Sequence, residues 1–166
     1  MKVHQYQDLI RIFSECFELE YNTKLVCGDD EPLYRPADEH CSYHSIIFAH
    51  GFFSSGLHEC AHWLIAGDAR RTQVDYGYWY VPDGRTAEQQ IEFQQVEVKP
   101  QALESILSSA AGYQFQFSID NLNGMAQDTE QFKQAVYQQI LTYETHGLPA
   151  RATVFREALR RFYGGC

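Results

Sequence analysis

The pattern of apolar and polar residues in the first half of the chain predicts an N-terminal helix and several short strands. Over residues 4–18 the apolar side chains recur at helical spacing, which predicts an amphipathic helix. Residues 23–27 and 45–49 predict strands, the second being a continuous apolar run typical of a buried strand. A proline within residues 33–37 favours an edge strand or an extended loop there. Aromatic residues predict a further strand at 75–81.

The second half of the chain is predicted to be mainly helical. A helix is expected over residues 86–98, and Pro100 is expected to break or restart it. The next amphipathic helix then reaches to Gly112. Residues 113–119 alternate apolar and polar side chains and predict a strand or an extended segment, and the last helix is predicted to end near Phe162.

Capping residues predict where two further helices begin or end. Ser54 or Ser55 is expected to cap the helix that follows the second strand, and Gly67 suits the left-handed residue after its C-terminus. Asp128 is the expected cap of a long helix over residues 129–143.

Composition narrows the class of protein. A length of 166 residues predicts a single domain, residues 1–166, and 45% apolar residues fit a globular core. No apolar run is long enough for a membrane span, and the net charge of −9 disfavours nucleic acid and anionic membranes as partners. The five cysteines form no Cys-x-x-Cys pair, and the first residues lack a secretory profile, so a cytoplasmic location is predicted.

The helix expected between residues 56 and 67 carries the candidate chemistry. His58 and His62 are four residues apart and so lie on one helical face, where both imidazoles can reach one metal ion. Glu59 completes the pattern H-E-x-x-H. The alternatives are a hydrogen-bonded polar patch and a structural ion without chemistry. Two nitrogens leave a metal site incomplete, so a third ligand must come from elsewhere in the chain.

Glu97 is the favoured third ligand among the carboxylates that follow. It stands between Val96 and Val98 beside a proline, and a charge among apolar residues is costly to bury without a neutralising partner. A metal ion would be that partner, and a lysine or arginine would be the alternative. His58, His62 and Glu97 would hold Zn²⁺ for hydrolysis with Glu59 as general base, or Fe²⁺ with open positions for O₂ and substrate. Spacing alone favours the zinc peptidase.

Longer motifs alter this choice. Matching stretches occur in order at residues 58–63, 75–85 and 96–103, with shorter ones at 29–32, 47–52 and 120–122. In these stretches the chain resembles the elongation factor P hydroxylase family along nearly its whole length. Cys60 departs from the family pattern, in which a larger aliphatic residue is common between the histidines, and the chain ends early, at Cys166.

The resemblance implies a small α+β fold, with a small sheet packed against several helices and H-E-x-x-H on a core helix. It implies O₂-dependent hydroxylation of the lysine of elongation factor P that already carries a β-lysyl group, with Fe²⁺ on His58, His62 and Glu97. Glu59 would then orient a ligand or relay a proton, and Tyr78 and Tyr80 would line the substrate channel. The acidic protein would attract the cationic side chain. The rivals are the zinc peptidase and a non-catalytic module that clamps the translation factor around a structural metal.

Overall fold

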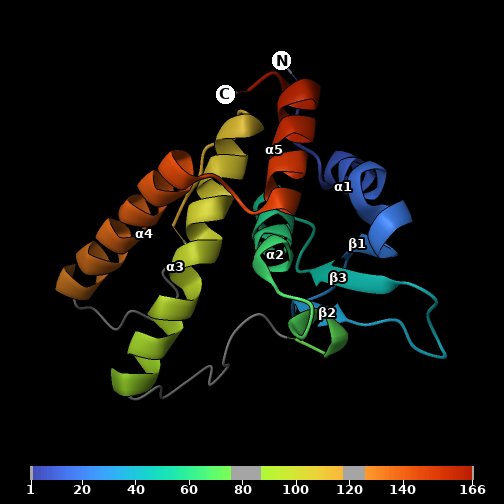
Figure 1. Ribbon diagram of the computed structural model, residues 1–166, viewed down its shortest axis with the longest axis horizontal. Helices are drawn as coiled ribbons and strands as arrows, with labels where there is room; N and C mark the ends of the chain where they lie inside the picture. The colour runs from blue at the N-terminus through green and yellow to red at the C-terminus, as the bar shows by residue number, and fades with distance from the viewer. Residues whose placement is uncertain (1, 76–86, 118–125, 166) are drawn as a thin grey trace.

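The structure is a computed structural model that describes residues 2–75, 87–117 and 126–165, with the backbone alone described at 87–95 and 126–128. Helices and a small sheet make up this part of the chain (Figure 1). In chain order the elements are α1 (Tyr6–Tyr21), β1 (Thr23–Cys27), β2 (Leu33–Arg35), β3 (His44–Phe48), α2 (Phe53–Ile65), the 3-10 turn η1 (Arg70–Thr72), α3 (Ala87–Ala110), α4 (Ala126–His146) and α5 (Ala150–Tyr163).

The sheet has three strands in the order β1-β3-β2. β3 pairs parallel with β1 and antiparallel with β2, so that Leu25 and Tyr34 both align with Ile46. Leu25 and Ile46 are buried, whereas β2 is only half-buried. β2 stands at one end of the strand order and so forms an edge of the sheet, which confirms the prediction of an edge strand in a proline-containing segment.

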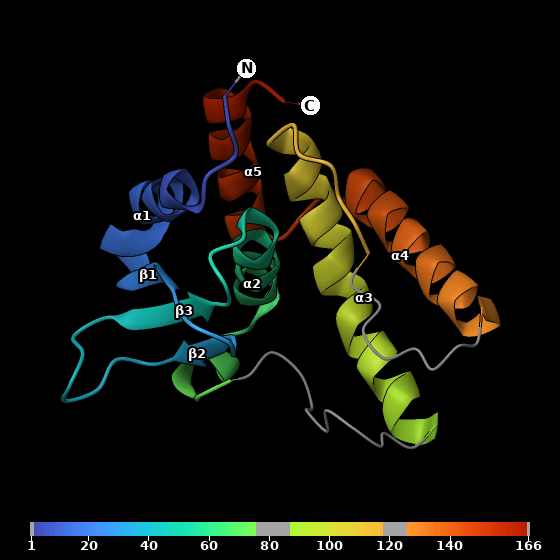
Figure 2. The ribbon, with the colours of Figure 1, turned by 180° about the vertical axis from the view of Figure 1, so that it is seen from behind.

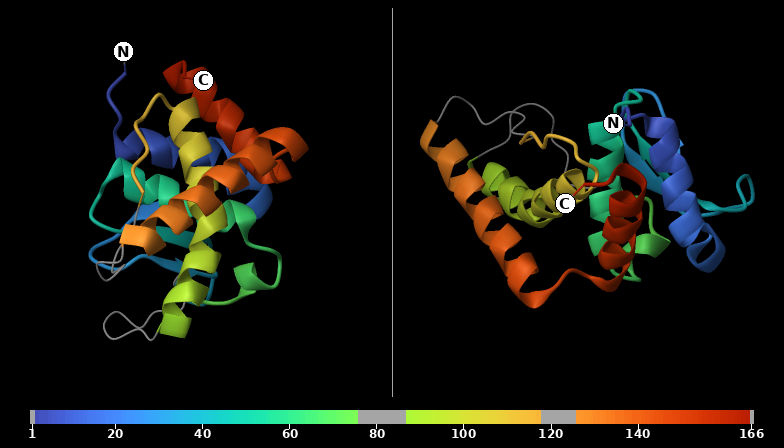
Figure 3. Two further views of the ribbon diagram at one scale, coloured as in Figure 1. Left: turned by 90° about the vertical axis from the view of Figure 1, so that its left-hand side faces the viewer. Right: turned by 90° about the horizontal axis from the view of Figure 1, so that it is seen from above.

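Helix α2 lies at the centre of the molecule, between the sheet and α1 on one side and α3 on the other (Figure 2). Its apolar face is fully buried, and the main core joins it to side chains from α1, α3 and α5, including Phe13, Leu107 and Phe155. The α+β prediction and the placing of the motif on a core helix are confirmed. α4 packs on the far side of α3 (Figure 3), around a small second cluster that includes Phe132. None of the helices in the described ranges combines the length and apolar composition of a membrane span.

The caps predicted for α2 are wrong at both ends. The helix starts at Phe53, directly after a turn in which His50 and Gly51 have φ angles of 62° and 68°, so neither serine caps it. At the other end Ala66 is extended, and Gly67 does not adopt the left-handed conformation. The guanidinium of Arg151 donates to the carbonyl oxygens of Trp63 and Ala66 at 2.8 and 2.6 Å instead. A distant side chain thus satisfies the carbonyls that a local cap would otherwise bind.

Two predictions in the second half are also wrong. α3 runs unbroken through Pro100 for 24 residues. An interior proline costs about 3 kcal/mol of helix stability, but Leu103 and Leu107 beyond it are fully buried, and their burial offsets that cost. α4 starts at Ala126, so Asp128 lies in its first turn rather than at its cap. An acidic residue in a first turn is still favoured by the helix dipole.

The predictions for the two aromatic segments have different outcomes. Residues 113–117 form no strand, although their burial alternates as predicted, and residues 118 and 119 of this prediction lie outside the described residues. Asp75 forms an isolated antiparallel bridge with Tyr34. Residues 76–81 of the other predicted strand lie outside the described residues. The remaining predicted helices and strands are confirmed to within a few residues of their bounds.

Candidate metal centre

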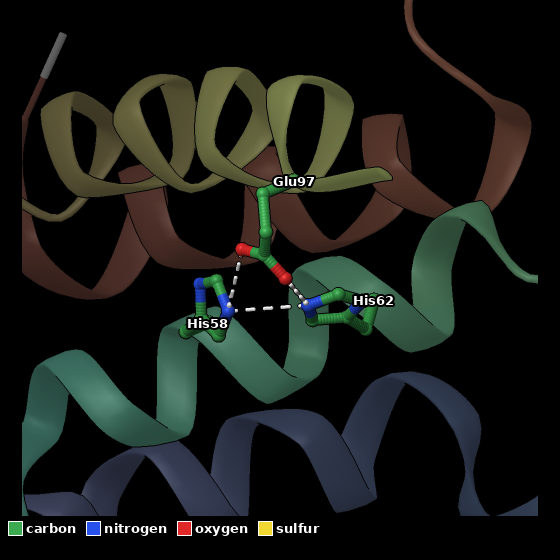
Figure 4. Close-up of side chains that lie close together, drawn as sticks. All are labelled: His58, His62 and Glu97. Atoms are coloured by element: carbon green, nitrogen blue, oxygen red, sulfur yellow. Dashed lines mark hydrogen bonds and ion pairs between the residues drawn. The ribbon is translucent and has the colours of Figure 1, made fainter. Parts of the chain in front are cut away.

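Two facing helices bring His58, His62 and Glu97 together (Figure 4). The histidines project from consecutive turns of α2, and Glu97 reaches them from α3. The Nε2 atoms of the two rings are 3.1 Å apart. Glu97 places Oε2 at 3.3 Å from Nε2 of His58 and Oε1 at 3.1 Å from Nε2 of His62. The three side chains therefore point at one common centre.

These separations match the edges of a metal coordination shell. Ligand atoms that lie about 2.0–2.2 Å from a metal ion are about 3.0 Å apart at right angles and about 3.4 Å apart at the tetrahedral angle. The observed 3.1–3.3 Å falls between the two. One carboxylate and two imidazoles would leave further positions on such an ion for other ligands.

Glu97 is deeply buried, with an exposed fraction of 2%. Its Oε1 is buried and accepts no hydrogen bond from the residues that the structure describes, despite its contact with His62. Gln101 approaches Oε2 at 3.5 Å. A buried carboxylate oxygen without a donor is costly unless a cation neutralises it. The residues present therefore fit a metal ion.

Glu104 orients the first histidine. Its Oε1 lies 2.6 Å from Nδ1 of His58, and both side chains are largely buried. A carboxylate acceptor at Nδ1 favours the tautomer with its proton there, which leaves the lone pair of Nε2 facing Glu97 and His62. Metal-binding histidines commonly have such a carboxylate behind them.

In the metal-free cluster, His58 and Glu97 shift each other's pKa values. Burial opposes the charge on His58, but hydrogen bonds to Glu104 and Glu97 outweigh it and hold the pKa of His58 well above its usual value. Burial likewise opposes the charge on Glu97, yet the two histidines hold the pKa of its carboxyl well below the usual range. The ionised carboxylate is the form that a divalent cation requires, and His58 must release its additional proton when such an ion binds.

Glu59 lies outside this cluster although it adjoins His58 in the chain. Its half-buried side chain lines a narrow pocket together with Tyr34, His62 and Trp63. Burial raises the pKa of its carboxyl. Glu59 is therefore close to the candidate metal centre without belonging to its three donors. Tyr78 and Tyr80, predicted to line the substrate channel, lie outside the described residues.

The role of Glu104 was not predicted from the sequence. Glu97, Gln101 and Glu104 are spaced i, i+4 and i+7, so they share one face of α3, and all three are buried. This spacing of three polar residues among apolar ones is visible in the sequence and could have identified Glu104 as a buried partner of Glu97. The expected break at Pro100 concealed it, because a broken helix would place Glu97 and Glu104 on different elements.

The fold and the site define a class. This is a small α+β domain whose core brings together two imidazoles and one carboxylate, the donor set found in non-haem iron oxygenases and in some zinc hydrolases.

Sequence comparison identifies the family within that class. The chain belongs to the elongation factor P hydroxylase family, whose sequence model matches residues 12–166. A relative from Haemophilus influenzae, named as the elongation factor P lysine hydroxylase, is 58% identical over 160 residues, which make up 96% of this chain and 90% of the relative. The resemblance seen in the motifs is therefore confirmed.

Proposed function

We propose that this chain hydroxylates a lysine side chain of elongation factor P, with Fe²⁺ held by His58, His62 and Glu97 and with O₂ as co-substrate. The relative from Haemophilus influenzae is named for that lysine hydroxylation. The observation that carries the proposal is the convergence of three donor atoms within 4.8 Å of one another in a largely buried site. We further propose that the lysine already carries a β-lysyl group.

Each residue of the centre has a distinct task in this proposal. His58 and His62 offer neutral Nε2 atoms, and Glu97 offers a carboxylate that offsets part of the metal charge. Glu104 holds the proton on Nδ1 of His58, at 2.6 Å. Ferrous iron, when bound, supplies the electrons and open positions that activate O₂. The low exposure of the cluster keeps bulk water from the reacting centre.

Charge favours the proposed substrate. The chain has a net charge of −9. A β-lysylated lysine ends in ammonium groups, so the protein field attracts that end of its partner. We propose the cytoplasm as the location of the reaction, because the proposed partner acts in translation.

The direct test measures the oxygen atom that is gained. Hydroxylation replaces C–H by C–OH, consumes one O₂, two electrons and two protons, and releases one water molecule; ascorbate serves as the reductant. Purified iron-loaded protein is incubated with β-lysylated elongation factor P, and the mass of the peptide that contains the modified lysine is measured by mass spectrometry. We expect a gain of one oxygen atom. An unchanged mass with bound iron, O₂ and reductant present would refute the proposal.

Three substitutions test the metal centre. His58→Ala, His62→Ala and Glu97→Ala should each abolish both iron binding and the mass gain. His40→Ala is the matched control, because this histidine is largely exposed and is not one of the three donors. Full hydroxylation by all three variants would support the clamp hypothesis instead. Bound zinc together with cleavage of a peptide bond would support the peptidase, which the family match does not favour.

A further inference from the structure

A second feature lies directly beside the candidate metal centre. A narrow pocket of about 20 Å³ is lined by Glu59, His62 and Trp63 of α2, by Tyr34 of β2, and by Arg70 and Asp75. Its volume suits a group about the size of one water molecule or one ammonium. His62 belongs both to this pocket and to the cluster of donors. The pocket and the donor cluster therefore meet at His62.

Most charges around the pocket are already paired. Arg70 contacts the carboxylate of Asp75 at 2.7 Å through one nitrogen and at 3.0 Å through another. Arg71, also in the lining, pairs with Asp68. Glu59 differs, since it has no hydrogen bond or ion pair with any residue in the described part of the chain. Its half-buried carboxylate is the charge in the pocket that lacks a counterion among those residues.

A metal ion in the neighbouring centre does not remove this imbalance. A divalent cation adds two positive charges there, and the carboxylates of Glu97 and Glu104 supply two negative ones. Glu59 still has no ion-pair partner among the described residues. An ion pair in a partly buried pocket is stronger than one in water, so a cationic ligand gains from meeting it there.

The pocket shares part of its lining with a larger groove. An open groove of about 390 Å³ adjoins it, and Tyr34 and Arg71 line both. The hydroxyl of Tyr34 donates to the carbonyl oxygen of Arg71 at 2.7 Å, which fixes this shared wall. Arg151 already covers the ring of Trp63, with its guanidinium carbon 4.4 Å from the centroid.

We propose that this pocket binds an ammonium group of the substrate side chain, with the Glu59 carboxylate as its counterion. The inference rests on the proposed function for the identity of the substrate, and it replaces the two roles expected for Glu59 from the sequence, which were ligand orientation and proton relay. The ammonium lies at Glu59 while the aliphatic chain passes His62. Glu59 then selects for a charged lysine side chain and fixes which carbon faces the metal centre.

Direct binding tests the pocket independently of hydroxylation. Iron-loaded protein is titrated anaerobically with n-butylammonium chloride, and the indole N–H signal of Trp63 is followed by NMR. We expect saturable binding, which Glu59→Gln weakens at least tenfold because a charged hydrogen bond is lost. Glu59→Asp, which keeps the charge, should recover part of the affinity. Glu20→Gln removes an exposed carboxylate on α1 and should change nothing.

An anionic and a neutral analogue of butylammonium test whether the pocket requires a positive charge. Sodium butyrate and 1-butanol, of similar length, should shift the Trp63 signal little. Binding of butyrate in preference to butylammonium would overturn the proposal, since it would mean that the arginines recognise an anion. Equal binding of butylammonium by wild type and Glu59→Gln would overturn it as well.

Kinetics with β-lysylated elongation factor P supply the second readout. Glu59→Gln should raise KM about ten- to a hundredfold, with a much smaller change in kcat, because binding rather than chemistry is weakened. A fall in kcat at constant KM would show a proton relay and refute the pocket assignment. If wild type binds butylammonium through Glu59 but does not hydroxylate the factor, the proposed function fails and the pocket stands. If wild type hydroxylates the factor without that binding, the pocket assignment fails and the proposed function stands.

Discussion

Glu104 provides a sensitive test of the centre, because it touches His58 and none of the other donors. Its carboxylate lies 2.6 Å from Nδ1 of His58, on the side of the ring that faces away from Glu97. Glu104→Ala removes the acceptor and leaves a buried N–H without a partner. Glu104→Gln keeps an oxygen acceptor of nearly the same shape but removes the charge. The two variants separate orientation of the ring from its electrostatic support.

The expected magnitude follows from that contact. A hydrogen bond to a charged group contributes about 1.5–3 kcal/mol, which corresponds to roughly a ten- to hundredfold change in an equilibrium constant. Loss of a carboxylate behind a metal-binding histidine typically lowers metal affinity by about 10–100-fold. We therefore expect Glu104→Ala to weaken metal binding by that factor. Glu104→Gln should fall between the alanine variant and wild type, because its amide still fixes the tautomer.

The assay is a competition between the protein and a chelator of known affinity, followed with Co²⁺ as a spectroscopic probe. Glu157→Ala serves as the control, since this acid pairs with Arg160 on the exposed face of α5. A shift in the visible spectrum of bound Co²⁺ would report altered geometry at His58 separately from any loss of stability. Wild-type affinity and spectrum in folded Glu104→Ala would refute the orienting role.

Three further predictions concern stability. In metal-free protein the pKa of Glu97 is lowered, so Glu97 stabilises the fold above its ordinary pKa of 4.5 and this stabilisation is lost as the pH falls. The pKa of His58 is raised, so His58 stabilises the fold below its ordinary pKa of 6.5 and this stabilisation is lost as the pH rises through the folded pKa. Melting curves should show a maximum between these limits, and added metal should abolish the alkaline decline. Leu107→Ala, at a site with 0% exposure, should lower the unfolding free energy by about 2–5 kcal/mol in urea titrations; a loss below about 1 kcal/mol would contradict the packing. Arg151→Met should cost about 1.5–3 kcal/mol by the same assay, because two carbonyls at the end of α2 lose a charged donor; wild-type stability would contradict that capping role.

Local pattern was enough to place most of the chain on the right elements. The spacing of apolar residues depends on which face of a helix or strand is buried, so α1, α2, α5 and the three strands follow from the sequence. The same reasoning put His58 and His62 on one face of a core helix. Desolvation of a carboxylate among apolar neighbours marked Glu97 as a buried charge, and its 2% exposure confirms that burial.

The features that the sequence did not predict depend on contacts between residues that are far apart in the chain. The cap of α2 comes from Arg151, far along the chain, and the continuity of α3 through Pro100 depends on packing against α2. Neither can be read from local propensity, because tertiary contacts supply the hydrogen bonds and the burial that outweigh it. Glu104 was missed for the same reason: its importance depends on α3 being one helix.

The sequence by itself determined the chemistry that is available, because two imidazoles on one helical face and a buried acid are properties of spacing and composition. Only the tertiary structure decided how that chemistry is arranged. It set Glu97 against both rings, put Glu104 behind one of them and left Glu59 in a separate pocket. The physical reason is that distances of about 3 Å between groups on different helices depend on how those helices pack, and no local pattern encodes that packing.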